Sequence, residues 1–213
     1  MIRIAQHHDW VVWIILGCIF LYIFMLISLR RDSGILEFLV QKIEDSANNY
    51  LSWIIISVVF CVVLSVLVSP YLPAVPESIS AVQIGGYELN KFGFSFLAIG
   101  SFYFLKNILS YLFFAGTGSG KKWEMFYFTS SKFYFCFSLI IMVLCVVDNF
   151  YMIDRTEMFH YCILGFSAIF LFKLSYYLFH SSRILPEIWY YKILYICTLQ
   201  IVPVLVLWKV LFF

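Results

Sequence analysis

The stretch WVVWIILGCIFLYIFMLISL, residues 10–29, contains no charged side chain. A helix rises about 1.5 Å per residue, so this stretch is long enough to cross the roughly 30 Å hydrocarbon core of a bilayer. It is too long for the apolar part of a signal peptide, and Arg30 and Arg31 follow it where a small-residue cleavage motif would stand. We therefore interpret it as the first membrane-spanning helix.

The composition of the whole chain also fits a protein that is surrounded by a lipid bilayer. Of its 213 residues, 63% are hydrophobic and 12% are charged, whereas ordinary soluble domains contain about 25% charged residues. A soluble chain of this size would need more polar surface to cover its core. The net charge of +2 leaves no large basic face for nucleic acid. The composition therefore argues against a soluble enzyme, a disordered tail and a nucleic-acid-binding module.

Five more apolar runs follow the first, and each is long enough to span a bilayer. We predict an all-α membrane protein: a bundle of six transmembrane helices with short loops, forming a single domain over residues 1–213. The predicted spans are residues 10–29, 51–69, 92–114, 133–153, 159–180 and 188–212. They use well over half of the chain, which leaves no room for a separate soluble domain.

Lysine and arginine residues alternate between the predicted loops. The first, third and fifth loops contain most of them, including Arg30, Arg31 and Lys121, whereas the N-terminal segment and the second and fourth loops contain only Arg3, Lys91 and Arg155. Short cytoplasmic loops are enriched in Lys and Arg. This bias predicts that both the N-terminus and the C-terminus lie outside the cell membrane, which is the periplasm in a Gram-negative cell.

Two connections carry patterns of their own. Apolar residues between Ile35 and Ile43 recur near helical spacing, which predicts a short cytoplasmic helix, either on the membrane surface or packed on the ends of its own bundle. On the external side, residues 82–89 resemble a small hairpin around Gly85 and Gly86. Because a lone two-stranded hairpin is marginal in water, we expect it to pack on the bundle or on a partner.

No motif in the chain predicts catalysis, a nucleotide or a metal. The glycine-rich segment 115–122 lacks the first glycine of a phosphate-binding loop, because Ala115 stands there, and Lys122 replaces its Ser or Thr. We interpret this segment as a flexible cytoplasmic linker. His7 and His8 could begin a metal site with His160, but adjacent histidines before a span are more typical of the solvated interface. We expect no cofactor, no metal, no nucleotide and a non-enzymatic role.

Polar residues inside the spans are the main functional signal, because each is costly in hydrocarbon. Lys106 and Lys173 each lie 14 residues after the start of spans that run in the same direction, so they share a depth of about 10 Å from the cytoplasmic face. Lys192 lies about one turn above the same face. The simpler interpretation is that these three lysines snorkel to water; the alternative is that they form a cationic pocket for an anionic lipid head group or a phosphate. The other polar residues within the spans are Asn107, Asp148, Asn149 and Gln200.

Two of these positions suggest specific roles. Asp148 near the external end of the fourth span could relay protons with His160, and the alternative is a hydrogen-bonded interface cluster. Pro203 cannot donate to the carbonyl of Leu199, so it predicts a helix kink in the sixth span. Gln200 could then bond the freed backbone or a neighbouring helix, which would be a structural role.

The segment from Tyr191 to Lys209, YKILYICTLQIVPVLVLWK, resembles the C-terminal signature of a family of small inner-membrane proteins in Bacteroidota, called domain of unknown function 4271. His8-Asp9-Trp10 and the segment KFYF at residues 132–135 are similar to the family in a weaker way. In this signature Gln200 stands where the family often has an acid. The resemblance implies a multi-pass protein of the bacterial inner (cytoplasmic) membrane and no particular chemistry.

Three functions compete on these observations. The first is a non-enzymatic integral membrane subunit or scaffold of a bacterial envelope complex for export or assembly, with a protein partner in the membrane and with membrane lipids around it. The second is a carrier or binding protein for a small anion or anionic lipid, based on the lysines at one depth. The third is a lipid-modifying membrane enzyme, which would need paired acids or a histidine-rich motif. No clear repeat relates the two halves of the chain, which disfavours many carrier folds.

Overall fold

The computed structural model describes residues 9–29, 34–41, 49–73, 90–151, 154–179, 185 and 188–212. Within these residues every regular element is a helix. The elements are α1 (Asp9–Phe24) with the π-helical turn η1 (Met25–Leu29), α2 (Ile35–Val40), α3 (Asn49–Val68) with the 3₁₀ turn η3 (Ser69–Tyr71), α5 (Lys91–Gly116), α6 (Gly120–Phe150), α7 (Arg155–Phe179), α8 (Trp189–Tyr195), the π-helical segment η4 (Ile196–Ile201) and α9 (Val202–Phe212).

Six of the described helical rods are long and apolar enough to cross a membrane. They cover residues 10–28, 49–71, 91–116, 122–150, 155–179 and 189–212, which confirms the predicted all-α bundle of six transmembrane helices. We therefore describe the chain as a multi-pass membrane protein. The fourth helix begins at Gly120, well before the predicted 133, because the residues after the glycine-rich turn continue the same helix.

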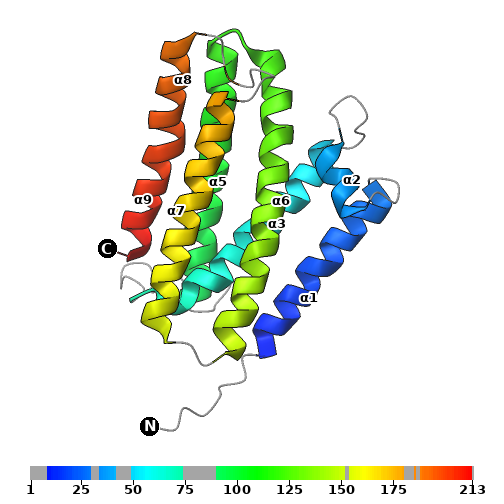
Figure 1. The fold of residues 1–213 in the computed structure, drawn as a ribbon, viewed down its shortest axis with the longest axis vertical. Helices are drawn as coiled ribbons and strands as arrows, with labels where there is room; N and C mark the ends of the chain where they lie inside the picture. Colours follow the sequence, from blue (N-terminus) through cyan, green and yellow to red (C-terminus); the bar gives the residue numbers. More distant parts are fainter. Residues whose placement is uncertain are drawn as a thin grey trace.

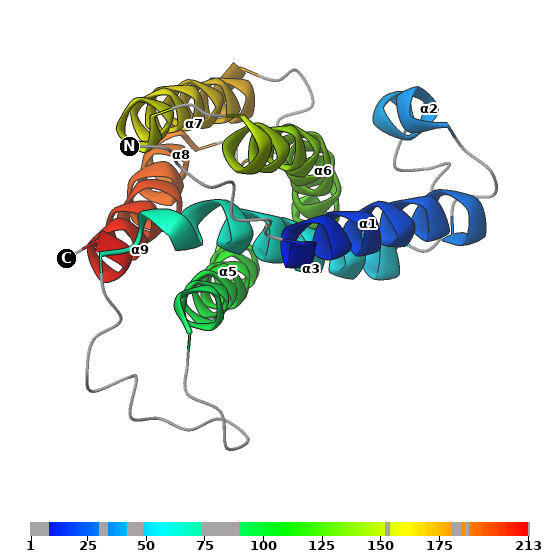
Figure 2. The same ribbon diagram turned by 90° about the horizontal axis from the view of Figure 1, so that it is seen from below.

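The rods form two layers that cross (Figures 1 and 2). Helices α5, α6, α7 and the C-terminal rod (α8, η4 and α9) run alongside one another. Helix α3 crosses them obliquely and packs on both α5 and α6, and α1 packs on α3. Helix α9 returns to pack against α5. The C-terminal rod and α5 are thus neighbours although most of the chain between them forms α6 and α7.

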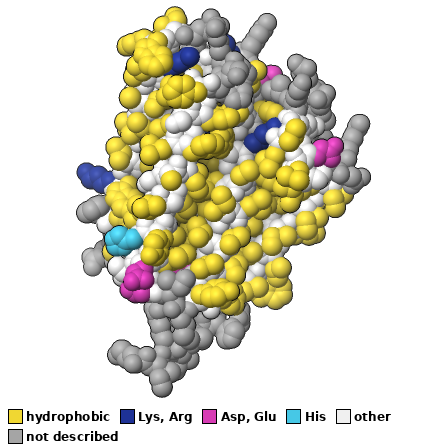
Figure 3. All heavy atoms as spheres, in the orientation of Figure 1, with side chains coloured by type: hydrophobic (Ala, Val, Ile, Leu, Met, Phe, Trp, Pro, Cys, Tyr) yellow, Lys and Arg dark blue, Asp and Glu magenta, His cyan; other side chains and the backbone are white. Residues whose placement is uncertain are grey.

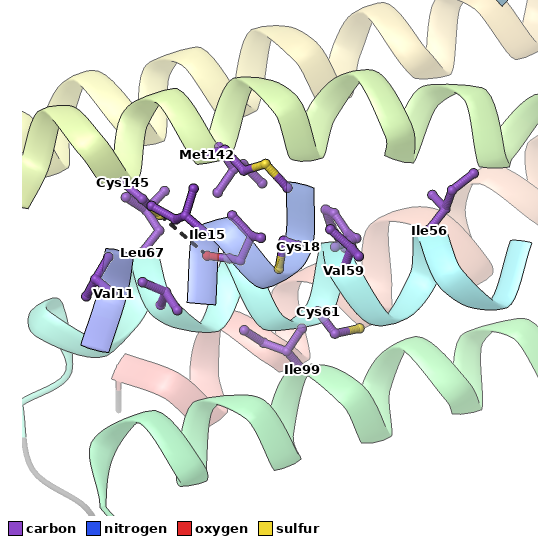
Figure 4. Packing of buried hydrophobic residues seen from close by; sticks show 14 of the residues in the cluster. Val11, Ile15, Cys18, Ile56, Val59, Cys61, Leu67, Ile99, Met142 and Cys145 are labelled. Atoms are coloured by element: carbon purple, nitrogen blue, oxygen red, sulfur yellow. Dashed lines mark hydrogen bonds between the residues drawn. The ribbon is translucent and has the colours of Figure 1, made fainter. Parts of the chain in front are cut away.

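The crossing layer packs through apolar side chains. Figure 4 shows this contact, in which the thiol of Cys145 on α6 points to the backbone carbonyl of Val63 on α3. Cys145 and Met25 are fully buried, as is Val59 at the centre of α3. The labelled residues of the cluster are Val11, Ile15 and Cys18 of α1, Ile56, Val59, Cys61 and Leu67 of α3, Ile99 of α5, and Met142 and Cys145 of α6.

Tyrosine–serine hydrogen bonds connect neighbouring helices throughout the bundle. Each pairs a tyrosine hydroxyl with a serine hydroxyl of another helix, and such polar contacts hold helices together where lipid provides no hydrophobic driving force between them. The pairs are Tyr22–Ser138 between α1 and α6, Ser57–Tyr103 (2.8 Å) between α3 and α5, Ser130–Tyr177 (2.6 Å) between α6 and α7, and Ser110–Tyr195 (3.3 Å) between α5 and α8.

A tight turn joins α5 to α6, where the sequence predicted a flexible linker. Gly118 has φ +68°, a conformation that glycine adopts without a steric cost. The amide of Ser119 donates to the carbonyl of Phe114 at 2.9 Å, and the amide of Gly118 donates to that of Ala115 at 3.2 Å. These two bonds form a Schellman motif, which ends α5 and reverses the chain within three residues. We call this end of the bundle the turn end.

Helix α2 is shorter than predicted and is anchored at two points. The ring of Phe38 is buried against Phe135 of α6, with a centroid distance of 5.1 Å. The ammonium of Lys132 donates to the carbonyls of Leu39 (2.8 Å) and Gln41 (2.6 Å). Lys132, which the sequence placed in a loop, therefore lies within α6 and caps the C-terminal end of α2. The predicted hairpin at residues 82–89 lies outside the described residues.

The outer surface of the bundle is largely apolar. Figure 3 shows hydrophobic side chains over most of the visible face, with few charged side chains among them. Trp13 is 73% exposed and Phe179 is 83% exposed. Such a surface suits lipid rather than water as the surrounding solvent.

Candidate functional site

Two lysines from parallel helices donate to the same oxygen in the interior of the bundle. Nζ of Lys173 on α7 lies 3.1 Å from Oη of Tyr134 on α6, and Nζ of Lys106 on α5 lies 3.4 Å from the same oxygen. Lys173 is only 8% exposed, and Lys106 is partly buried. The equal depth predicted for Lys106 and Lys173 thus corresponds to a contact through one shared tyrosine. Both ammonium groups point inward rather than to the aqueous surface.

The C-terminal rod completes this arrangement. Oε1 of Gln200 accepts a hydrogen bond from Lys106 at 2.8 Å, and Nε2 of Gln200 donates to Oη of Tyr195 at 2.9 Å. Gln200 is fully buried. We call Lys106, Lys173, Tyr134 and Gln200 the lysine cluster. Four rods contribute to it: α5, α6, α7 and the C-terminal rod.

A π-helical segment precedes Pro203 and carries Gln200. Over Ile196–Ile201 the helix widens, and the amide of Val202 donates to the carbonyl of Cys197, five residues earlier. Single π-helical turns commonly occur at functional sites. The structure thus accommodates Pro203 with a π turn, and Gln200 bonds a neighbouring helix rather than the backbone near Leu199.

Aromatic rings surround the ammonium of Lys173. Its Nζ lies 4.2 Å from the ring centroid of Tyr134 and 5.6 Å from that of Tyr177. The negative face of an aromatic ring attracts a cation, and the attraction increases when the pair is removed from water. The rings therefore stabilise the charge of Lys173 without neutralising it.

The lysine cluster contains more positive charge and more donors than its neighbours can satisfy. No carboxylate of the described residues forms an ion pair with Lys106 or Lys173. The acids of α6, Glu124 and Asp148, lie about 15 Å and about 21 Å along the helix from Tyr134. An ammonium has three N–H donors and a tyrosine hydroxyl has one. Lys106 uses two donors and Lys173 uses one, and the hydroxyl hydrogen of Tyr134 has no acceptor among the described residues. A bound group with several acceptor oxygens would satisfy this excess.

The structure separates Lys192 from the predicted pocket. Lys192 lies on α8, eight residues before Gln200 and therefore about 12 Å nearer the turn end. Its ammonium makes no hydrogen bond within the described part of the chain. The predicted trio of lysines is thus reduced to a pair.

The remaining intramembrane polar residues bond locally. Nδ2 of Asn107 donates to the carbonyl of Tyr103 at 2.9 Å, and Nδ2 of Asn149 donates to that of Cys145 at 2.8 Å. Both bonds lie within the residue's own helix. These two asparagines are therefore satisfied by the backbone.

Asp148 and His160 have different partners, so the structure does not pair them as the relay hypothesis required. The hydroxyl of Tyr71 donates to Asp148 at 2.6 Å, and the ring nitrogen Nδ1 of His160 lies 2.7 Å from the carbonyl of Thr156 on its own helix. Tyr71 also stacks on Phe159, with a centroid distance of 5.1 Å. Tyr71 is therefore the hydrogen-bond partner of Asp148, and His160 is not part of this contact. The proposed metal-binding pair, His7 and His8, lies outside the described residues.

Sequence reasoning missed Tyr134 and Tyr195. Tyr134 is the second residue of the span predicted over 133–153, a place where tyrosine commonly anchors a helix at the membrane interface. The actual helix begins at Gly120, which places Tyr134 well inside it. A correct helix start would have indicated an internal tyrosine close to the depth of Lys106 and Lys173.

Comparison with known proteins identifies a family but no activity. No curated protein and no solved structure matches the chain. The family described as a domain of unknown function (DUF4271) matches residues 10–211, which include the whole lysine cluster and all six membrane-spanning helices except the last residue of the sixth. The match extends far beyond the C-terminal signature from which the resemblance was first drawn. The chain therefore belongs to the DUF4271 family.

Proposed function

We propose that this membrane protein binds an anionic group between α5, α6, α7 and the C-terminal rod. One observation carries the proposal: the ammonium groups of Lys106 and Lys173 share the oxygen of Tyr134, and no described carboxylate neutralises them. Two like charges held together in a partly desolvated site repel each other unless an anion lies between or beside them. The bound anion thus completes the site electrostatically.

The same group supplies the missing hydrogen-bond acceptors. Phosphate and carboxylate oxygens accept charge-assisted bonds from ammonium groups, which are roughly twice as strong as bonds between neutral groups. The free N–H donors of Lys106 and Lys173 and the hydroxyl of Tyr134 would all bond such oxygens. This role corresponds to the carrier or binding protein that was the second function predicted from the sequence.

The other two predicted functions have less support. A subunit of an envelope export or assembly complex was predicted from missing catalytic motifs, and the described contacts add no feature specific to it. A lipid-modifying enzyme would require paired acids, and Asp148 bonds Tyr71 instead. We therefore place the anion-binding role first.

Native mass spectrometry of the full chain, purified in a mild detergent, tests this proposal. We expect an anionic lipid or small anion to copurify with the wild-type protein and to be lost from the variants Lys106→Met and Lys173→Met. Lys192→Met is the matched control, because it removes a lysine of the same bundle that lies outside the lysine cluster. Equal anion occupancy in all four proteins would contradict the proposal.

A further inference from the structure

The lysine cluster lies at the level of the short helix α2. Lys132 holds the C-terminal carbonyls of α2, and Phe135 packs on Phe38 of α2. Tyr134 lies between these two residues in α6. Along the bundle axis, Tyr134 and α2 therefore lie within about one helical turn of each other. The height of α2 in the membrane therefore fixes the height of the lysine cluster.

Helix α2 has the character of a helix at the membrane surface. Phe38 anchors it to the bundle, while Leu36 is 78% exposed and Val40 is 81% exposed. Glu37 is exposed on the same short helix. Exposed apolar side chains beside a charged residue suit the boundary between head groups and acyl chains. A position of α2 at this boundary would place the lysine cluster near the level of lipid head groups rather than at the bilayer centre.

A layer of aromatic rings lies between the lysine cluster and the turn end. It contains one ring from each of the four rods that form the cluster, and all four residues are at most 4% exposed. Ring centroids of neighbours are 5.2–5.8 Å apart. These rings close the axial route from the aqueous phase at the turn end. The residues of this layer, which we call the aromatic cap, are Phe114 of α5, Phe126 of α6, Tyr177 of α7 and Tyr195 of α8.

A second group of rings lies on the opposite side of the cluster. Phe60 of α3 packs on Tyr134 with a centroid distance of 4.8 Å and on Phe137 at 5.8 Å. Tyr103 packs edge-on against Tyr134 at 5.2 Å, and Phe166 packs against Phe137 at 5.2 Å. Rings thus lie on both axial sides of the cluster, while the side chain of Lys106 remains partly exposed. A ligand reaches the cluster most directly from the bilayer.

We infer that the bound anion is the phosphate monoester head of a membrane lipid, which enters sideways from the head-group layer. This inference rests on the proposed anion-binding function and specifies its ligand. A phosphate monoester carries a charge of about −1.5 to −2 at pH 7 and has three strong acceptor oxygens. That charge matches the two lysines, and the three oxygens match the unused donors of Lys106, Lys173 and Tyr134. A phosphodiester lipid has one charge and two such oxygens, so it satisfies the site less completely.

Competition between defined anions tests the inference. The full chain is delipidated in mild detergent and titrated with phosphatidic acid, phosphatidylglycerol or inorganic phosphate, and occupancy is measured by native mass spectrometry. We expect phosphatidic acid to bind at least about tenfold more tightly than phosphatidylglycerol, because it offers an additional charge to the same lysines. We expect inorganic phosphate to compete only weakly, because it lacks the acyl chains that hold a lipid against the apolar surface of the bundle.

Three other outcomes would contradict the inference or the proposed function, and each points to a different part. Equal binding of the two lipids would overturn the preference for a monoester. Tight binding of inorganic phosphate without binding of phosphatidic acid would overturn the lipid source. If no anion depends on Lys106 or Lys173, the proposed function itself fails. Lys106→Arg keeps the charge and serves as the folded control if Lys106→Met does not purify, because it should retain phosphatidic acid while Lys106→Gln should not.

Discussion

The side-chain oxygen Oε1 of Gln200 accepts a hydrogen bond from Nζ of Lys106 at 2.8 Å. This neutral amide occupies the position in which a carboxylate would form an ion pair. Because the partner is neutral, it does not offset the positive charge of the Lys106 ammonium. The identity of one residue in the C-terminal rod thus determines whether the lysine cluster is neutralised within the protein.

The variant Gln200→Glu tests this relationship. We expect the new carboxylate to pair with Lys106, to lower the affinity for phosphatidic acid by about tenfold or more, and to raise the melting temperature of the ligand-free protein. Native mass spectrometry and thermal melting measure the two effects. Gln200→Met is the uncharged comparison: it removes the hydrogen bond without adding charge, so it should lower stability and reduce lipid affinity less than Gln200→Glu does. An unchanged affinity in Gln200→Glu would show that the charge of Lys106 does not contribute to binding.

Tyr134 is expected to matter through its hydroxyl. Tyr134→Phe removes the oxygen shared by Lys106 and Lys173, so we expect weaker lipid binding and lower stability. Tyr103→Phe is the matched control, because its hydroxyl bonds Ser57 outside the cluster. It should cost about 0.6 kcal/mol of stability, typical of a hydrogen bond between membrane helices, without affecting binding. Equal lipid affinity in both variants would show that the hydroxyl of Tyr134 does not contribute to lipid binding.

Binding is expected to depend on pH through the lipid. The second ionisation of a phosphate monoester has a pKa of about 6, so phosphatidic acid is closer to a dianion above this pH and to a monoanion below it. We expect the retention of phosphatidic acid relative to phosphatidylglycerol to be greatest at pH 7 to 8 and to decrease toward pH 5, since any change in the charge of the lysines acts on both lipids. Phosphatidylglycerol keeps one charge over this range and provides the control. No described Asp, Glu or His contacts the lysine cluster, so a parallel decrease for both lipids would argue against a monoester ligand.

The pair Tyr22–Ser138 is expected to stabilise the contact between α1 and α6. Both residues are buried, and their hydroxyls bond each other. A double-mutant cycle with Tyr22→Phe and Ser138→Ala should give a coupling free energy of about 0.6 kcal/mol. Thermal or denaturant unfolding in detergent measures it. A coupling near zero would mean that packing alone holds α1 on the bundle.

Lys132 is expected to hold α2 in place. Lys132→Met removes both hydrogen bonds to the carbonyls of Leu39 and Gln41. We expect faster hydrogen exchange of the backbone amides of α2, because local opening becomes easier. The amides at the centre of α6 should be unaffected and act as the internal reference. Unchanged exchange in α2 would show that Phe38 alone anchors the helix.

The six spans could be predicted because each is a long apolar run, and bilayer thickness fixes the length that such a run must have. Equal depth for Lys106 and Lys173 followed from counting residues along two helices that run the same way. This counting does not require knowledge of helix packing. It therefore gave the relative height of Lys106 and Lys173 without any information on helix neighbours.

The contacts within the lysine cluster could not be predicted, because they depend on which helices are neighbours and on how each helix is rotated. A membrane helix that is apolar all round has no polar face to indicate its orientation, so Tyr134 and Tyr195 gave no sign that they point inward. The contact between Lys106 and Gln200 requires the C-terminal rod to pack on α5, which chain order does not predict. Lys192 was included in the pocket by its nearness to the membrane face, and the structure places it two turns away from Gln200.

The most direct measurement is an electron cryo-microscopy map of the full chain in a nanodisc that contains phosphatidic acid. The account predicts phosphate density beside Tyr134, within hydrogen-bond distance of Nζ of both Lys106 and Lys173, continuous with acyl-chain density leading sideways into the bilayer. A map that resolves both lysine side chains with no density between them, and with phosphatidic acid only on the outer surface of the bundle, would contradict it.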